Sequence, residues 1–306
     1  MRIAIDIQGV QSEGSRTRGI GRYSLAIVKT LINNFSEHEY FLVANAALND
    51  CKLDFKDELE KNNVNYHQWY SPCPLDFISN NNINYRIGIY LRTYAFSLLN
   101  PDIVLMTSFF EGFKDNCLTD LDKNLLSAPV TSIFYDLIPL INSNLYLDNN
   151  PDFSKFYKSK LQKVQLLDAL LAISKSSSKE LIDHLQIYPK NVFNISSACD
   201  RNIFKQEVST EYKKFKDLDH LKPFILYSGA SDPRKNVRRL LEAFSDLSLQ
   251  LKNVNLVLVG KLLPQEIELI NTWISLFSIN PERVFKLGYI PDDELVFLYQ
   301  NCDLFV

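Results

Sequence analysis

Residues that bind metals or form covalent cross-links are sparse in this sequence. Its five cysteines (Cys51, Cys73, Cys117, Cys199 and Cys302) are scattered and odd in number. They lack the paired spacing of a zinc site and the density of a secreted disulfide scaffold. The four histidines show no paired spacing either. This pattern predicts a protein of the reducing cytoplasm.

Long apolar runs and an excess of charge of one sign are also missing. No run approaches the roughly 18 apolar residues of a membrane-spanning helix, and no signal peptide precedes the apolar segment 3–7. The 33 basic and 36 acidic side chains give a net charge of −3. The chain therefore has no overall attraction for nucleic acid or for an anionic membrane, and any phosphate recognition must be local.

The sequence does contain apolar strand-like runs that alternate with segments of helical spacing. The predicted strands cover residues 2–7, 40–44, 64–69, 103–106, 130–135, 170–173, 192–195, 224–228, 255–259, 284–287 and 303–306. This alternation predicts an α/β protein with doubly wound parallel sheets. Segment 198–223 is charged and lacks periodicity. We therefore predict an N-terminal domain of residues 1–197, a linker of residues 198–223 and a partial C-terminal domain of residues 224–306.

One stretch of the second predicted domain has the pattern of an anion site. The apolar strand 225–228 runs into Gly229, a turn follows, and helical spacing begins near residue 236. Arg234 and Lys235 lie in this turn, where free N–H groups and the positive end of a helix dipole favour an anion. Two solvated cations are the alternative, although this end of a helix is unfavourable for them. A phosphate group is the predicted ligand.

Several motifs occur in the order that one enzyme family shows. They are Gly19–Tyr23, Tyr135–Pro139, Ile173–Ser177, Gly229–Asn236, Leu258–Gly260, Leu287–Ile290 and Asp303–Val306. Together they resemble the retaining GT-B glycosyltransferases of family four, in particular the mannosyltransferase-like enzymes of bacterial polysaccharide assembly. The resemblance covers nearly the whole chain, whereas each motif alone would be weak.

This resemblance implies two Rossmann-like domains that face each other across a cleft. A nucleoside-diphosphate sugar would be held mainly by the second domain, and a glycan or lipid-linked acceptor by the first. The donor would be a co-substrate, and neither a cofactor nor a metal is expected. Gly229, Arg234 and Lys235 would bind the donor diphosphate, and the two cations would neutralise it as it leaves. Gly19 and Gly21 would let a loop approach the phosphates or the acceptor, or they simply begin a helix.

The catalytic positions implied by the family are Tyr135 and Asp136, and they include a departure. The family usually has His where Tyr135 stands, and a phenol with a reference pKa of about 10 is a poor acid or base near neutrality. Asp136 would orient the sugar or the acceptor, or it closes a turn. Ala230 replaces an Arg that many relatives carry. The family's pair of glutamates, seven residues apart, is expected after Val306, so we expect a fragment or a truncated reading frame.

Acceptor or sugar contacts are assigned to Arg18, Ser174, Phe110 and Glu111. Ser174 is equally explained as a helix N-cap, Phe110 as packing and Arg18 as a solvated side chain. A helix near residues 153–163 carries four lysines and three aromatic residues that would suit an anionic lipid surface, although a solvated helix face is the simpler interpretation. These residues are Phe153, Lys155, Phe156, Tyr157, Lys158, Lys160 and Lys163.

The sequence thus favours a cytoplasmic retaining hexosyltransferase, with mannose as a candidate sugar and a peripheral contact at the inner membrane surface as a further expectation. As given, the chain is expected to be inactive or incomplete, because half of the donor pocket lies in the absent segment. The diphosphate would leave from the face that the acceptor hydroxyl attacks, and no side chain is an evident nucleophile. The alternative is a non-catalytic GT-B-like binding module, which the Tyr135 and Ala230 departures and the absent segment favour. An epimerase or a phosphorylase is a weaker rival, because the motif series follows the transferases.

Overall fold

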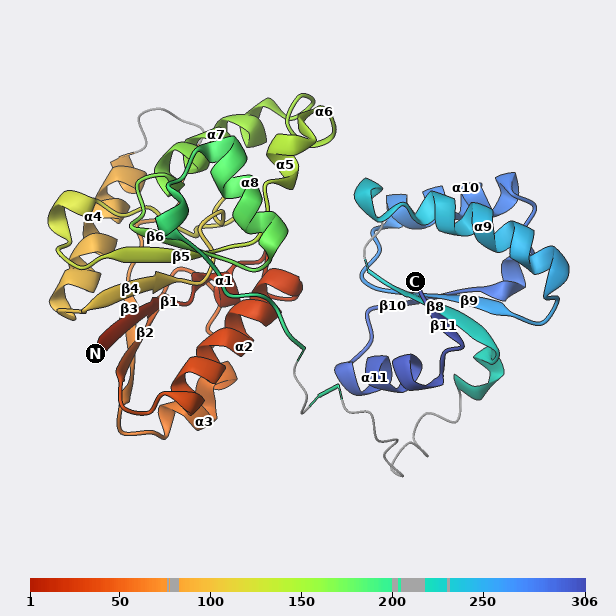
Figure 1. The fold of residues 1–306 in the computed structure, drawn as a ribbon, viewed down its shortest axis with the longest axis horizontal. Coiled ribbons are helices and arrows are strands. Elements are labelled where there is room, and N and C mark those ends of the chain that lie inside the picture. Colours follow the sequence, from red (N-terminus) through yellow and green to blue (C-terminus); the bar gives the residue numbers. More distant parts are fainter. Residues whose placement is uncertain (76, 78–82, 200–202, 205–217, 230–231) are drawn as a thin grey trace. The chain divides into compact units, whose positions relative to one another are not determined.

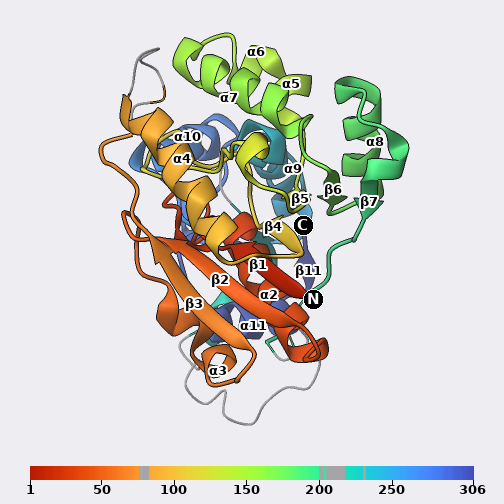
Figure 2. The same cartoon turned by 90° about the vertical axis from the view of Figure 1, so that its left-hand side faces the viewer.

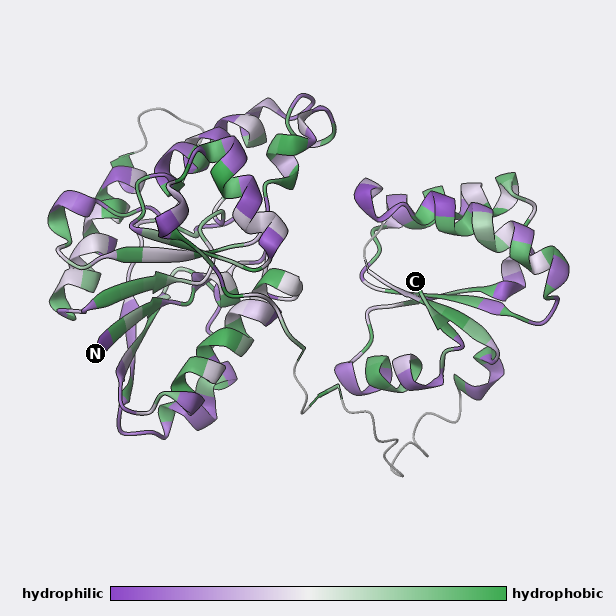
Figure 3. Cartoon of the chain, viewed as in Figure 1, coloured by the Kyte–Doolittle hydropathy of each residue, from purple (hydrophilic) through white to green (hydrophobic). Residues whose placement is uncertain are grey.

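The chain forms two compact units, Met1–Ala198 and Cys199–Val306. The computed structural model describes residues 1–75, 77, 83–199, 203–204, 218–229 and 232–306. Most of the predicted linker of residues 198–223 lies outside the described residues, as does Ala230. Both units are α/β layers around a parallel sheet, and the central strands of each sheet are largely hydrophobic (Figures 1 and 3).

The first unit contains a seven-stranded sheet in the order β3-β2-β1-β4-β5-β6-β7, and every pair is parallel. Its strands are β1 (Arg2–Asp6), β2 (Glu39–Asn45), β3 (Val64–Trp69), β4 (Ile103–Met106), β5 (Val130–Phe134), β6 (Ala169–Ala172) and β7 (Val192–Asn194). Runs of buried residues fill these strands because helices cover both faces of the sheet. Each strand was predicted from its apolar run, within one or two residues.

Helices of the first unit pack on the sheet in two layers (Figures 1 and 2). One layer holds α2 and α3, and the other holds α4, α7 and α8, each with its own hydrophobic core. The helices are α1 (Gln8–Gln11), α2 (Gly19–Asn34), α3 (Lys56–Leu59), α4 (Ile83–Leu98), α5 (Ile138–Ile141), α6 (Ser143–Tyr146), α7 (Pro151–Val164) and α8 (Lys175–Leu185). Short 3₁₀ turns lie at η1 (Lys52–Phe55), η2 (Lys123–Leu125) and η3 (Pro189–Asn191).

The second unit contains a four-stranded parallel sheet in the order β10-β9-β8-β11. The strands are β8 (Phe224–Ser228), β9 (Asn255–Val259), β10 (Val284–Gly288) and β11 (Leu304–Phe305). The helices α9 (Val237–Gln250) and α10 (Pro264–Leu276) cover one face, and α11 (Asp292–Asn301) covers the other (Figure 1). The turns η5 (Pro233–Lys235) and η6 (Pro281–Arg283) precede α9 and β10.

Residues 8–18 begin with the buried one-turn helix α1, which is too short for a period to show in the sequence. The fully buried positions of α2 are Gly21, Ser24, Val28 and Ile32. Its Tyr23, Ile27 and Leu31 pack against the same core and are partly buried. Ser24 is accommodated there because its Oγ donates to Thr107 O at 3.3 Å.

Candidate functional site

The order of the strands reverses once in each sheet. In the first unit, the reversal lies between β1 and β4, and in the second it lies between β8 and β11. In open parallel sheets, ligands bind outside the carboxyl ends of the strands at such a reversal. The predicted site residues follow these strands: Gly19 and Gly21 come after β1, Phe110 and Glu111 after β4, and the Gly229–Asn236 loop after β8.

Gly21 and Gly19 differ in what surrounds them. The Gly21 N–H donates to Ser15 O at 3.1 Å, and a Cβ at Gly21 would lie 2.5 Å from that oxygen and 2.6 Å from Arg16 O. A Cβ at Gly19 would meet no atom within 4 Å. Gly21 is therefore required by the folded loop itself, whereas Gly19 leaves space in front of the first turn of α2. Arg18 is the exposed N-cap residue of this helix.

This difference gives a paired prediction. Gly21→Ala should lower the melting temperature of the chain by several degrees, because the new methyl group collides with backbone that cannot yield cheaply. Gly19→Ala should leave the melting temperature within about a degree, since its methyl group enters open space. If Gly19 admits a donor or an acceptor, Gly19→Ala will instead weaken ligand binding or transfer. Calorimetry and a transfer assay on both variants check this, and equal stability losses would contradict it.

Tyr135 connects the end of β5 to the start of α2. Its hydroxyl lies 3.0 Å from Ser24 Oγ, 3.0 Å from Thr107 O and 3.3 Å from Ile20 O. Burial raises the pKa of this phenol well above 10, so the hydroxyl keeps its proton. The geometry gives Tyr135 a positioning role for the glycine-containing loop. Its assignment as a catalytic residue stays a prediction.

Tyr135→Phe removes the hydroxyl and leaves Ser24 Oγ and two carbonyl oxygens short of a partner. We expect a loss of about 1–2 kcal/mol in the free energy of unfolding, measured by urea denaturation. Tyr23→Phe is the matched control, because Tyr23 also lies on α2 and its hydroxyl donates to Ser196 O at 2.7 Å in an exposed place. A Tyr135→Phe variant no less stable than Tyr23→Phe would rule out the positioning role.

Asp136 and Ser174 both stabilise turns. Asp136 Oδ1 accepts a hydrogen bond from the Ile138 N–H at 3.1 Å, so this carboxylate closes the turn after β5. Ser174 is the N-cap of α8, and its Oγ accepts from the Ser177 N–H at 3.0 Å. The N-cap was predicted from the sequence, and it is confirmed. Both side chains are half-buried. Ser177 Oγ donates to Tyr135 O at 2.5 Å, which brings the start of α8 to the same sheet edge as Tyr135.

Glu111 is a buried acidic group of the loop after β4. Its Oε2 lies 2.8 Å from Ser12 Oγ, and its Oε1 accepts from Ser108 Oγ at 2.9 Å. Ser12 Oγ is also 2.8 Å from Asp115 Oδ2. Burial raises the pKa of Glu111, while its serine partners oppose this shift. Ser12 has one hydroxyl proton, so it can donate to only one of these two carboxylates at a time.

Phe110, next to Glu111, is a packing residue as far as its described contacts go. Its ring lies 5.2 Å from that of Tyr157 and 6.2 Å from that of Phe134, both centroid to centroid. The ring is half-buried in the core under α7. An acceptor contact by Phe110 stays a prediction. Ser12 and Asp115 lie beside Glu111 at the sheet edge, and neither was predicted as a site residue from the sequence.

The lysine-bearing helix is not the cationic face that the sequence suggested. Lys160 is fully buried and donates to Asp120 Oδ1 at 2.7 Å, and Lys163 pairs with the same carboxylate. Phe156 and Tyr157 are buried as well. That expectation was wrong because spacing alone did not reveal Asp120, which lies far away in the sequence and draws both ammonium groups inward.

In the second unit, the loop after β8 is preorganised around Asp232. Asp232 Oδ1 accepts from the Arg234 N–H at 3.1 Å and lies 3.4 Å from Arg234 Nε. Arg234 and Lys235 form the exposed 3₁₀ turn η5, and Asn236 takes a left-handed conformation (φ 53°) before α9 begins. The two cations therefore lie in the turn directly before α9.

Three neighbouring strands of this sheet end in glycine. Gly229 follows β8, Gly260 follows β9 with φ 145°, and Gly288 ends β10 with φ 70°. The Gly229 N–H donates to Val259 O, and the Gly260 N–H donates to Gly288 O, both at 2.8 Å. A Cβ at Gly260 would collide with Gly229 O. A Cβ at Gly288, in contrast, would meet no atom within 4 Å, so this edge of the sheet is close-packed at Gly229 and Gly260 and has free space at Gly288.

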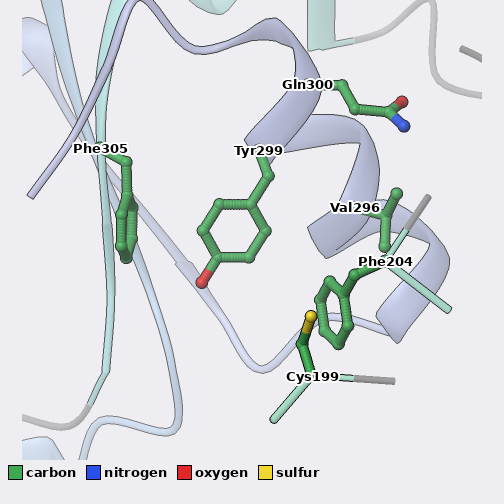
Figure 4. Close-up of a pocket in the computed structure, with 6 residues that line it drawn as sticks. All are labelled: Cys199, Phe204, Val296, Tyr299, Gln300 and Phe305. Carbon is green, nitrogen blue, oxygen red and sulfur yellow. The ribbon is translucent and has the colours of Figure 1, made fainter. Parts of the chain in front are cut away.

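A separate pocket of about 430 Å³ lies beside α11 (Figure 4). Its walls are mostly apolar, and they contain none of the predicted site residues; they are formed by Cys199, Phe204, Val296, Tyr299, Gln300 and Phe305. Within the described part of the chain, no cluster of three or more His, Cys, Asp or Glu is placed to hold a metal ion. No helix of that part is long and apolar enough to cross a membrane.

The two parallel sheets, each with one reversal of strand order, have the GT-B fold, and solved structures agree at this level. Anabaena Alr3699/HepE in complex with UDP has a TM-score of 0.61 at 15% identity and covers 99% of this chain and 72% of its own. A glycosyltransferase from Rickettsia africae has a TM-score of 0.63 at 16% identity, over 99% and 72%. WaaG, a glycosyltransferase involved in lipopolysaccharide biosynthesis, has 0.60 at 13%, over 100% and 74%.

Sequence relatives give the family. Residues 208–306 match the family model of glycosyl transferases group 1. A serotype-specific mannosyltransferase WbdA from Escherichia coli is 33% identical over 314 residues, which cover all of this chain and 37% of the relative. A second Escherichia coli WbdA is 30% identical over 286 residues, which cover 91% of this chain and 35% of the relative. The chain thus carries a match to the group 1 glycosyl transferases over residues 208–306 and is similar to these mannosyltransferases along its whole length, and it spans about a third of the length of these relatives.

Proposed function

We propose that this protein transfers a hexosyl unit, with mannose as the first candidate, from a nucleoside-diphosphate sugar to a surface glycan or a lipid-linked acceptor. The carrying observation is the loop after β8, which places Arg234 and Lys235 exposed at the strand reversal of the second sheet. The whole-length relation to mannosyltransferases supports the choice of sugar. UDP and UDP-glucose bound by the Anabaena neighbour support the donor class.

In this proposal, the second unit binds the donor and the first binds the acceptor. The guanidinium of Arg234 and the ammonium of Lys235 neutralise the diphosphate as the glycosidic bond breaks, so this step uses protein cations and no metal. The space at Gly288, where an added Cβ would meet no atom within 4 Å, leaves room for a phosphate to approach the backbone. The acceptor hydroxyl attacks on the face from which the diphosphate departs, which retains the anomeric configuration.

A reducing cytoplasm suits the cysteines, because all five thiols are free. A lipid-linked acceptor would bring the protein to the inner membrane surface. The inward-turned Lys160 and Lys163 remove part of the support for a lysine-rich face of α7, so peripheral binding is proposed on the chemistry of the acceptor alone.

The second candidate is a GT-B-like module that binds sugar nucleotides without transferring the sugar. The contacts of Tyr135 support this binding module, because its hydroxyl is hydrogen-bonded to Ser24 Oγ and Thr107 O and would have to leave them to act on a substrate. A histidine at this place would present a group that titrates near neutrality, whereas this buried phenol does not.

The two candidates separate in one experiment. The purified chain is incubated with the UDP and GDP derivatives of mannose and glucose and with short mannose oligosaccharides, and the products are followed by mass spectrometry. Transfer with an α-linked product from an α-linked donor supports the transferase and retention, and proton NMR coupling constants report the linkage. Saturable nucleotide binding without transfer supports the binding module. Neither binding nor transfer would contradict both.

A further inference from the structure

Helix α4 exposes a stripe of large apolar side chains on the side that faces away from the sheet. The α4 stripe consists of Ile83 (67% exposed), Ile87 (42%), Tyr90 (49%), Leu91 (44%), Tyr94 (61%) and Leu98 (65%). Positions three and four apart lie on one face of a helix, so the stripe is continuous over about 22 Å. Figure 2 shows α4 as an outer helix of the first unit. Exposed apolar patches of this kind mark interaction surfaces.

The charges on α4 limit what can cover the α4 stripe. The helix contains no acidic residue, and of its two arginines Arg92 is buried and paired with Asp6 at 3.0 Å. Arg86 is therefore its one exposed cation. An anionic lipid surface attracts helices that carry several Lys or Arg beside the apolar face, and α4 does not. The helix suits an equally uncharged protein surface.

The spacing of the α4 stripe is the same when it is read in either direction. Reversal exchanges Ile83 with Leu98, Ile87 with Tyr94 and Tyr90 with Leu91. Two such helices laid antiparallel, with the two-fold axis between Tyr90 and Leu91, therefore place an apolar residue of each copy at every level. A two-fold interface uses the same surface on both subunits, so it requires this self-complementarity.

We propose that the α4 stripe is a homodimer interface in which the α4 helices of two copies of this chain pack antiparallel. Arg86 fits this arrangement, because antiparallel packing carries it to the last turn of the partner's helix, where free carbonyl groups favour a cation. A parallel arrangement would instead bring the two Arg86 side chains side by side. A stable interface takes roughly 800 Å² from each partner, and the six stripe side chains would form its buried centre inside a polar rim.

The first test measures the oligomeric state of the 306-residue chain by analytical ultracentrifugation. The wild type should show a reversible monomer–dimer equilibrium. Leu91→Glu should weaken the dimer by at least about 100-fold, because it buries an unpaired charge twice beside the two-fold axis. Leu249→Glu is the matched control, since Leu249 is a 77% exposed leucine of α9 outside the stripe. It should dimerise as the wild type does.

The second test checks the register of the two helices. Ile87→Glu and Tyr94→Lys variants should each be monomeric, and mixing them should restore a heterodimer, because Glu and Lys then meet at one level. Ile83→Glu mixed with Tyr94→Lys is the control and should stay monomeric, since residue 83 is opposite residue 98. Circular dichroism and melting curves confirm that each variant is folded.

Three outcomes would overturn the proposal. One is a wild-type chain that stays monomeric at all concentrations tested. Another is a dimer that Leu91→Glu and Leu249→Glu weaken equally. The third is a monomer that binds vesicles of phosphatidylglycerol and phosphatidylethanolamine through the α4 stripe, which would assign the surface to lipid instead.

Discussion

Replacing Lys235 by alanine should lower the rate of sugar transfer by on the order of 100-fold or more, because an exposed ammonium group next to the diphosphate stabilises charge that appears only as the bond breaks. Lys235 is the better test residue of the two cations, since Arg234 is partly neutralised by Asp232 at 3.4 Å. The loss should fall mainly on kcat, because a ground-state donor carries less charge on its bridging oxygen than the transition state does.

The matched control is Lys252→Ala, an exposed lysine of the second unit that lies beyond α9. It should transfer sugar at the wild-type rate. Initial rates with a saturating nucleoside-diphosphate sugar measure kcat, and titration with UDP and GDP measures binding separately. A Lys235→Ala enzyme with unchanged kcat would remove this residue from the reaction, whatever its affinity for the nucleotides.

The strands were predictable because their physics is local. Continuous apolar runs such as 103–106 and 255–259 belong to strands buried on both faces, and they appear in the structure at those bounds. The short helices α5 and α6 were not predicted, since four residues contain too few turns for a period to show.

The candidate site was predictable only in part. Order along the chain and glycine positions located the loops after β1 and β8, and the structure places both at strand reversals. Contacts between residues far apart in the chain could not be predicted from the sequence. Tyr135 meets Ser24 across 111 positions, and Ser12 meets Glu111 across 99. Such contacts form because the strand order brings these loops together at one edge of the sheet, and the amino-acid composition does not reveal that order.

Lys160 is a further example of a distant partner, and it predicts a large effect on stability. Its ammonium group donates to Thr119 Oγ1 at 2.6 Å and to Asp120 Oδ1 at 2.7 Å, and its side chain has no exposed surface. The rings of Phe77, Phe109 and Phe156 surround it at 5.2 to 5.6 Å from their centroids. Burial alone would raise the pKa of Asp120, but Lys160 and Lys163 lower it below its usual range.

Lys160→Met should cost about 3–5 kcal/mol in the free energy of unfolding, because it takes away the fully buried countercharge of a buried carboxylate. Lys158→Met is the control, since Lys158 is exposed on the same helix two residues away, and it should cost less than about 0.5 kcal/mol. Urea denaturation of the two variants measures the difference. A Lys160→Met chain as stable as Lys158→Met would show that Asp120 needs only Lys163.

The pH dependence of the free energy of unfolding tests the Lys160–Asp120 pair through its carboxylate. A carboxyl group with a lowered pKa in the folded state contributes stability above its unfolded pKa of about 3.9 and loses that contribution as the pH falls below it. The wild-type chain should therefore lose stability between neutral pH and pH 3 more steeply than Asp120→Asn does.

The same cluster is joined to the loop that carries Glu111. Because Thr119 Oγ1 also donates to Phe109 O at 2.6 Å, loosening this cluster also frees that loop. Lys160→Met should then reduce the rate of sugar transfer even at temperatures where the chain remains folded. Transfer rates of this variant and of the wild type, measured at those temperatures, show whether the Lys160–Asp120 pair positions the loop.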